Sequence, residues 1–224
     1  MTKYGLPQVV LLPLVLVLLI GGFSVFGSGF LPGWSVIAIE VILVVTLLWA
    51  FSFFRDPRRT IQHREDLLLS PADGRVADIE LVENDFIGGR ALRIGIFLSV
   101  FNVHINRSPC NAKVEKISYK KGKYLNAMNP MAGKVNESND IGMVRLDHPK
   151  DKLLVRQISG AIARRIVCRT DTGEHLAAGQ KFGMIKFGSR TELYLSAGEN
   201  TKALVKIGDK VKAGITALVK YETR

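Results

Sequence analysis

The sequence predicts a mainly β (α+β) body, a flattened β-barrel or sandwich, preceded by an N-terminal apolar helical hairpin. Residues 6–26 and 34–53 are almost wholly apolar, and each run has roughly the 20 residues needed to cross a hydrocarbon core. From residue 67 onward, short alternating runs are separated by Gly, Asn, Asp and Pro, which is typical of strands and tight turns. The chain therefore divides into a hairpin at residues 1–54, a charged linker at 55–66 and the β-rich body at 67–224.

The hairpin is expected to associate with a membrane. Residues 27–33 form a turn-rich break between the two runs, and Trp34 and Trp49 fall near the ends of the second run, where interfacial rings belong. Pro13 and the Gly-rich break leave open whether the pair spans the bilayer or only dips into it. A signal peptide is not expected, because the first run is too long and a second follows directly.

The charge of the chain lies outside the hairpin. The formal net charge is +11, and residues 1–53 contain only Lys3 and Glu40 as charged groups, so the whole excess falls on residues 54–224. Several Arg residues follow the second run, which by the positive-inside rule places the body on the cytoplasmic side of the cell membrane. The basic body favours an anionic membrane surface as a partner. Nucleic acid is disfavoured, because the sequence has no helix-turn-helix, zinc-finger or aromatic RNA-binding signature.

Three parts of the body have a less regular pattern. Residues 111–140 are polar and basic and are expected to form a mobile loop with one short helix. Residues 153–168 fit a helix or a strand with a turn equally well, because Ile recurs at helical spacing among β-branched neighbours. Gly208 and Asp209 are typical of a hairpin turn between two alternating strands.

Two pieces of the body resemble the half-motifs of biotinyl and lipoyl carrier domains, which are flattened β-barrels of the barrel-sandwich hybrid type. Residues 71–76 resemble the first half-motif and residues 207–214 the second. A carrier presents a modified Lys at a hairpin tip, and the sequence shows no such Lys. The resemblance therefore favours the β architecture and not a carrier function.

Cysteine and histidine spacing gives no sign of a disulfide framework or a metal site. Cys110 and Cys168 are the only cysteines and lie far apart in the sequence. His63, His148 and His175 have no metal-ligand spacing with one another or with the cysteines, so no metal is expected.

The bond between Gly188 and Ser189 is the candidate reactive feature. Apolar and polar residues alternate on both sides of this pair, which predicts two short strands that meet at a tight bend. Because Gly has no Cβ, the Ser189 hydroxyl can approach the Gly188 carbonyl carbon. Attack would turn the amide into an ester, and elimination and hydrolysis would leave a pyruvoyl group. A Gly-Ser pair by itself is nearly always a plain turn, so other residues must support this hypothesis.

Two further stretches supply that support. Residues 70–74 and 101–109 each end a predicted strand, and they contain Asp73 and His104. An Asp can orient an imidazole, and the imidazole can accept the proton of a Ser hydroxyl. Taken alone, Asp73 beside Gly74 is a turn residue by default, and a lone His such as His104 is more often structural.

The ordered set of stretches resembles the phosphatidylserine decarboxylase family, specifically its short proenzyme type whose cleavage motif ends in Gly-Ser-Arg. The similarity extends from about residue 53 to near the C-terminus and rests on the following stretches: residues 53–57, 70–74, 101–109, 157–166, 179–183 and 187–190. Each stretch is unspecific by itself, whereas their order and spacing are specific.

The resemblance implies that the chain cleaves itself between Gly188 and Ser189. A β chain, 1–188, and an α chain, 189–224, would remain together as a heterodimer, and Ser189 would become the covalent pyruvoyl cofactor. Asp73, His104 and Ser189 would form the self-processing triad. Longer members carry another His three residues before the position of His104, and here that position is Phe101, so any separate role for that His is vacant or filled by another residue.

The resemblance also implies a substrate and a reaction. The pyruvoyl ketone would condense with the amine of phosphatidylserine and stabilise the electron pair left when carbon dioxide departs, and His104 would return a proton to the carbon. The product would be phosphatidylethanolamine. Basic residues between 113 and 134 would meet the lipid phosphate or the anionic surface, or would be a solvated face.

Two alternatives remain at this stage. The body could be a membrane-tethered, biotinyl- or lipoyl-like adaptor without catalysis, or a pyruvoyl decarboxylase that acts on another amine-bearing substrate. The apolar hairpin argues against a soluble substrate. The sequence leaves the lipid tails and any homo-oligomer open.

Overall fold

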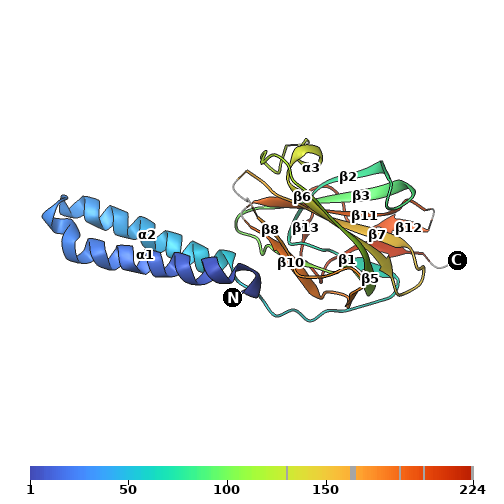
Figure 1. Ribbon diagram of the computed structural model, residues 1–224, viewed down its shortest axis with the longest axis horizontal. Helices are drawn as coiled ribbons and strands as arrows, with labels where there is room; N and C mark the ends of the chain where they lie inside the picture. The colour runs from blue at the N-terminus through green and yellow to red at the C-terminus, as the bar shows by residue number, and fades with distance from the viewer. Residues whose placement is uncertain (130, 162–164, 187, 199, 223–224) are drawn as a thin grey trace. The chain divides into compact units, whose positions relative to one another are not determined.

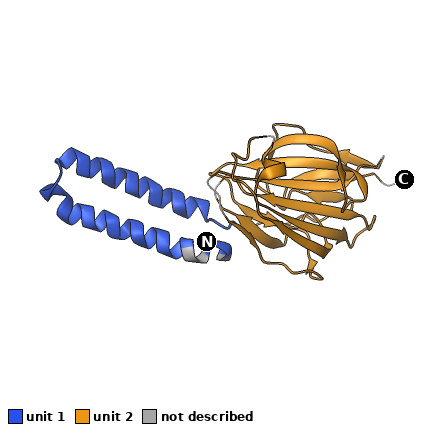
Figure 2. Cartoon of the chain, turned by 45° about the horizontal axis from the view of Figure 1, so that its top comes forward, with its two compact units in different colours: residues 1–57 blue, residues 58–224 orange. Residues whose placement is uncertain are grey.

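A computed structural model describes all residues except 130, 162–164, 187, 199 and 223–224, and leaves the side chains of residues 3, 6 and 7 undescribed. The chain forms two compact units, residues 1–57 and residues 58–224 (Figure 2). The division lies within the segment that the sequence predicts as a linker.

The first unit is a pair of apolar helices, as predicted. It contains the short 3-10 turns η1 (Lys3–Gly5) and η2 (Gly27–Gly29) and the helices α1 (Leu6–Phe26) and α2 (Gly33–Phe53), which run side by side (Figure 1). Spans of 22 and 21 residues in this unit are long and apolar enough to cross a membrane. The Ser24 hydroxyl donates a hydrogen bond of 2.7 Å to Glu40, so the one acidic group of the pair has a polar partner on the other helix.

The second unit is built from antiparallel strands. Its described elements are β1 (Leu67–Leu69), β2 (Gly74–Asn84), β3 (Gly89–Leu98), β4 (Ile105–Arg107), β5 (Ala112–Lys120), the short helix α3 (Ala132–Val135), β6 (Ser138–Arg145), β7 (Lys152–Ile158), β8 (Ile166–Cys168), β9 (His175–Leu176), β10 (Lys181–Ile185), β11 (Ser189–Ser196), β12 (Thr201–Ala203), β13 (Lys210–Val211) and β14 (Ala217–Tyr221). The largest sheet has the order β13-β2-β3-β11-β7-β6-β5-β9, and two small sheets have the orders β4-β10-β8 and β1-β14-β12 (Figure 1). The mainly β prediction is confirmed.

The hydrophobic core lies between the large sheet and the small ones. It combines Ile94 and Ile96 of β3 with Phe182 of β10 and Leu218 of β14, all of which are fully buried. Strand β11 lies between β3 and β7 and is buried along nearly its whole length. Its inner face, which carries Leu193, meets this core, and its outer face carries polar side chains.

The two carrier-like half-motifs pair with each other. Lys210 and Val211 of β13 lie opposite Arg75 and Gly74 of β2, and the Val76 N–H donates to the Asp209 carbonyl at 2.9 Å. This pairing corrects the hairpin predicted around Gly208, because the strand before that turn, β12, pairs with β14 instead. A side chain at Gly74 would overlap the Phe97 backbone, so the close packing of β2 and β3 requires Gly there.

The predicted loop at residues 111–140 is partly wrong. Its first third is β5, a full strand that pairs with β6 and β9, and its last third contains the short helix α3 and the start of β6. The alternation in β5 is weak because most of its side chains are solvated: only Ala112 and Val114 are fully buried. Residues 153–168, which the sequence left between helix and strand, form most of β7 and the whole of β8.

Candidate active site

The Gly188–Ser189 bond lies where the chain passes from one sheet to another. Strand β10 ends at Ile185 in a small sheet, and β11 begins at Ser189 in the large sheet, as the predicted bend requires. Phe187, which belongs to the predicted motif, lies outside the described residues. Gly188 has a φ of +62°, a left-handed conformation that strains a residue with a Cβ.

Ser189 is fully buried and has an unusual environment for a hydroxyl. Its backbone lies opposite Leu98 at the start of the β3–β11 ladder. Its Oγ has no hydrogen-bond partner among the described residues. A buried polar atom without a partner costs free energy, typically about 1–3 kcal/mol, and such atoms in native proteins often serve chemistry. The orphaned hydroxyl fits a nucleophile or a modification site.

His104 is held against the same bend by the register of β4 and β10. The Ile185 N–H donates to the His104 carbonyl at 3.2 Å, which extends the β4–β10 pairing by one residue. The buried imidazole therefore lies beside Gly188, whose N–H is 3.3 Å from His104 Nε2. The structure thus brings His104 and the Gly188–Ser189 segment together.

The partners of the imidazole define its tautomer. Nδ1 lies 2.9 Å from the Asn102 carbonyl oxygen, which can only accept a hydrogen bond, so Nδ1 carries the proton. Nε2 accepts from the Gly188 N–H and is therefore unprotonated. A neutral imidazole with its lone pair on the side of the Gly188–Ser189 segment is the form that a general base requires.

Asp73 is fixed by Arg59, a residue of the predicted linker whose pattern gives no sign of this contact. Its carboxylate accepts two hydrogen bonds from Arg59, at 2.6 and 2.7 Å, and a third from the Ala213 N–H at 2.8 Å. Arg59 also donates to the Ala213 carbonyl. Both side chains of the pair are nearly buried. The turn that contains Asp73 packs next to β4, where the Arg107 N–H donates a hydrogen bond to the Pro71 carbonyl.

A buried amide network connects the motifs. Asn106 of β4 donates to the Thr191 hydroxyl at 3.0 Å and to the Pro71 carbonyl at 3.3 Å. Gln157 of β7 donates to Asn106 at 2.9 Å and accepts from Asn139 of β6 at 3.1 Å. Because Thr191 follows Ser189 by two residues on the inner face of β11, this network fixes the strand that carries the nucleophile candidate.

The outer face of β11 carries an ionic network. Arg190 is paired with Glu192 at 2.7 Å and with Asp78 at 2.6 Å, and Tyr194 donates to Glu192 at 2.5 Å. Burial and the negative charge of Glu192 raise the pKa of Tyr194 well above its usual range. Arg190, the last residue of the Gly-Ser-Arg motif, therefore points away from Ser189 and anchors the strand.

Lys186 is a buried cation close to the bend. Its side chain is buried, and burial, followed by the charge of Arg165, lowers the pKa of its ammonium group. Its N–H donates to the Arg165 carbonyl at 3.3 Å. The surroundings of Lys186, two residues before Gly188, therefore disfavour its charged form.

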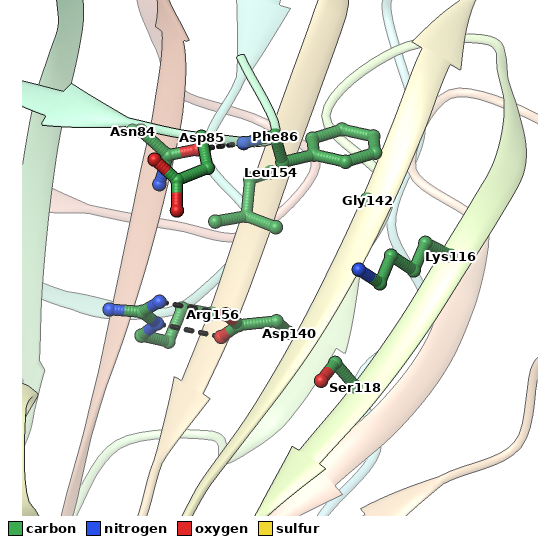
Figure 3. A pocket seen from close by; sticks show the side chains of 9 residues that line it. All are labelled: Asn84, Asp85, Phe86, Lys116, Ser118, Asp140, Gly142, Leu154 and Arg156. Carbon is green, nitrogen blue, oxygen red and sulfur yellow. Dashed lines mark hydrogen bonds and ion pairs between the residues drawn. The ribbon is translucent and has the colours of Figure 1, made fainter. Parts of the chain in front are cut away.

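Two cavities lie on the outer face of the large sheet. One of about 190 Å³ contains the paired side chains of Arg156 and Asp140, with Lys116 and Phe86 at its edge (Figure 3). Another, of about 720 Å³, includes Arg190 in its lining. Asp73, His104 and Ser189 line neither of them. Among the described residues, no cluster of three His, Cys, Asp or Glu side chains could hold a metal ion.

Comparison with known proteins adds the observation that decides the family. The family model described as phosphatidylserine decarboxylase matches residues 47–219, which is most of the chain. This chain belongs to the phosphatidylserine decarboxylase family. Its second unit, with the Gly188–Ser189 bend, lies almost entirely within the matched region.

Similar proteins cover most of the chain. The phosphatidylserine decarboxylase proenzyme of Nitrosomonas europaea is 41% identical over 205 residues, which are 87% of this chain and 93% of the relative. That of Carboxydothermus hydrogenoformans is 47% identical over 79% of this chain and 82% of its own. That of Rhodopirellula baltica is 38% identical over 98% and 88%. Membership of this decarboxylase family makes the chain a carboxy-lyase.

Proposed function

We propose that this chain converts phosphatidylserine to phosphatidylethanolamine with a pyruvoyl group that it makes from its own Ser189. Family membership supports the substrate and the reaction. The main support for a pyruvoyl cofactor is the fully buried Ser189 hydroxyl, which has no hydrogen-bond partner among the described residues. Ser189 also follows a glycine with left-handed backbone angles, at the point where the chain passes from one sheet to another.

The proposed self-cleavage consumes one water. Ser189 Oγ attacks the Gly188 carbonyl carbon, the C–N bond breaks, and the nitrogen takes up the hydroxyl proton, which leaves an ester. Loss of the Ser189 Cα proton then expels the Gly188 carboxylate and leaves a dehydroalanine. Addition of water releases ammonia and leaves a ketone at the new N-terminus.

His104 is the proposed base for the first step. Its unprotonated Nε2 already contacts the Gly188 N–H, one peptide unit before the reacting bond. For this step Nε2 would have to come within hydrogen-bond reach of the proton on Ser189 Oγ. Asp73 is the third residue of the proposed triad. Its carboxylate is bonded to Arg59 and to the Ala213 N–H, and His104 Nδ1 faces the Asn102 carbonyl, so a direct Asp73–His104 hydrogen bond would require these groups to rearrange.

The two products would stay together as one heterodimer. The proposed α chain contributes β11, β13 and β14, and each of them pairs with strands of the proposed β chain: β11 with β3 and β7, β13 with β2, and β14 with β1. Cutting one bond between two sheets removes none of these ladders. The fold therefore supports cleavage without dissociation.

Once formed, the pyruvoyl group would supply the electron sink for decarboxylation. His104, held beside the new N-terminus by the β4–β10 pairing, would donate the proton that replaces the lost carboxylate. The helices α1 and α2 would keep the enzyme at the membrane that holds its substrate, with the basic body on the cytoplasmic side.

Mass spectrometry of the purified chain tests the proposal. We expect fragments that correspond to residues 1–188 and 189–224, the second with a ketone in place of its amino group. Catalytically active material made of one unmodified chain would contradict the pyruvoyl mechanism, and an inactive single chain would favour the adaptor alternative.

A decarboxylation assay tests the substrate. Phosphatidylserine in mixed micelles should release carbon dioxide, whereas free serine at the same concentration should not. Equal rates with both substrates would show that the enzyme recognises only the serine group, and they would contradict specificity for the lipid.

A further inference from the structure

A second glycine, Gly160, lies directly against the bond proposed to break. It follows β7 in a short loop and is buried. A Cβ atom at Gly160 would overlap the Gly188 carbonyl oxygen, and it would lie 3.0 Å from the Gly188 carbonyl carbon. The bare Cα of Gly160 therefore forms one wall of the space that the carbonyl occupies.

The requirement for glycine at this position is spatial. The left-handed glycines of the described chain include Gly188 but not Gly160, so the backbone of Gly160 has a conformation open to other residues. A Cβ would also lie 3.4 Å from the Ala127 Cβ, so this second neighbour would already be in van der Waals contact with it. A larger residue would thus press on the Gly188 carbonyl.

The loop that carries Gly160 is held in place by its neighbour. The Ser159 N–H donates to the Glu137 carbonyl at 2.9 Å, and the Asn136 side chain donates to the Ser159 carbonyl at 2.8 Å. Asn136 also exchanges two hydrogen bonds with the Leu125 backbone. These bonds fix Gly160 relative to β6 and β7, so it can act as a rigid stop.

The residues on both sides of the Gly188 carbonyl are also held in place. The Gly188 N–H donates a hydrogen bond to His104, and Ser189 pairs with Leu98 at the start of the β3–β11 ladder. A displaced carbonyl would have to twist the one peptide that links these two anchors. That peptide is the one that Ser189 Oγ attacks in the proposed function.

We propose that Gly160 is a positioning residue for self-cleavage: its missing side chain seats the Gly188 carbonyl so that one face of the carbonyl carbon is presented to Ser189 Oγ. This proposal rests on the self-cleavage proposed above. A misplacement of about 1 Å at a reacting group costs roughly 10²-fold in rate, so the effect of a single methyl group should be large.

The test is the rate of self-cleavage of full-length Gly160→Ala precursor, followed by mass spectrometry after rapid purification in detergent. We expect cleavage at least about 10²-fold slower than in the unmodified chain. After prolonged incubation, decarboxylation of phosphatidylserine per mole of pyruvoyl group should fall far less than the cleavage rate, because the mature enzyme no longer contains the Gly188–Ser189 bond. A purely structural role would lower both quantities together.

Two matched variants control for the added methyl group. Gly198→Ala places a Cβ whose nearest neighbour is the Thr201 hydroxyl at 4.0 Å, and Gly142→Ala crowds the Phe86 ring on the outer face of the sheet. Both should cleave at the rate of the unmodified chain. If Gly160→Ala does not fold, Asn136→Ser loosens the Gly160 loop without crowding the carbonyl, and it should slow cleavage by a smaller factor.

The outcomes separate the two proposals. An unmodified chain that never cleaves overturns the proposed function and this inference with it. An unmodified chain that cleaves, together with a folded Gly160→Ala variant that cleaves as fast, overturns only the inference. Normal cleavage in Asn136→Ser, where Gly160→Ala is unfolded, also overturns it.

Discussion

The two faces of β11 differ in how completely their polar groups are paired. On the inner face, the Ser189 hydroxyl is buried without a hydrogen-bond partner among the described residues. On the outer face, its neighbour Arg190 is paired with both Asp78 and Glu192. One strand thus places an unpaired hydroxyl one residue away from an arginine with two ion-pair partners.

This difference shows how the fold can hold a buried, unpaired hydroxyl that is unfavourable for stability. A strained or unsatisfied residue persists only when the surrounding structure fixes it. Here the fixation comes from the ladders with β3 and β7, the amide network below Thr191 and the ion pairs around Arg190. In the proposed function the inner face would supply the nucleophile, while the ion pairs of the outer face hold the strand in place.

The largest expected effect is that of Ser189→Ala. Removal of the nucleophile should abolish both cleavage and decarboxylation, while the free energy of unfolding should stay equal or rise slightly, because a buried orphan hydroxyl is removed. Mass spectrometry and urea denaturation measure the two properties. A marked loss of stability would contradict the view that this hydroxyl is unsatisfied.

His104→Ala should have the second largest effect. Loss of a general base typically lowers a rate by about 10²–10⁴-fold, so mostly uncleaved chain should accumulate. A time course of cleavage measured on gels gives the rate. If this variant is processed at the normal rate, the assignment of His104 as the base is wrong.

Glu192→Ala tests the outer face. It removes an acceptor from Arg190 and from Tyr194, and breaking a buried ion pair costs about 3–5 kcal/mol. Because Arg190 keeps Asp78, we expect a loss of about 3 kcal/mol in urea unfolding of the Ser189→Ala precursor. In a Glu192→Ala chain that retains Ser189, the folded protein should cleave itself at close to the normal rate. A loss of cleavage as large as that in His104→Ala would show that the two faces of β11 do not act independently.

The smallest expected effect is on the pH dependence of stability, and it comes from Cys110 in the core under the inner face of β11. Burial raises the pKa of the Cys110 thiol from 9.0 to about 12. The unfolded chain would lose this proton first, so the contribution to stability is complete below pH 9 and declines as the pH rises from 9 to 12. Cys110→Ala should reduce the loss of stability over that interval, as thermal unfolding at a series of pH values would show. An unchanged pH dependence would contradict it.

Local patterns in the sequence determined several features of this protein. Two apolar runs predicted the helices α1 and α2, because a run of that length and composition has few alternatives. Alternation around Gly188 predicted the bend between β10 and β11, since a strand repeats every two residues. The order of the motifs indicated the family, which the comparisons confirm.

Only the tertiary structure determined how distant residues meet. Arg59 looked like one charge of a linker, yet it pairs with Asp73, and Gly160 looked like an ordinary turn residue, yet it adjoins the Gly188 carbonyl. Weak alternation hid β5, because its outer side chains are solvated. Periodicity records which face of an element is buried, but it carries no information on which residue of another element lies there. That choice is made by packing and register across the sheets.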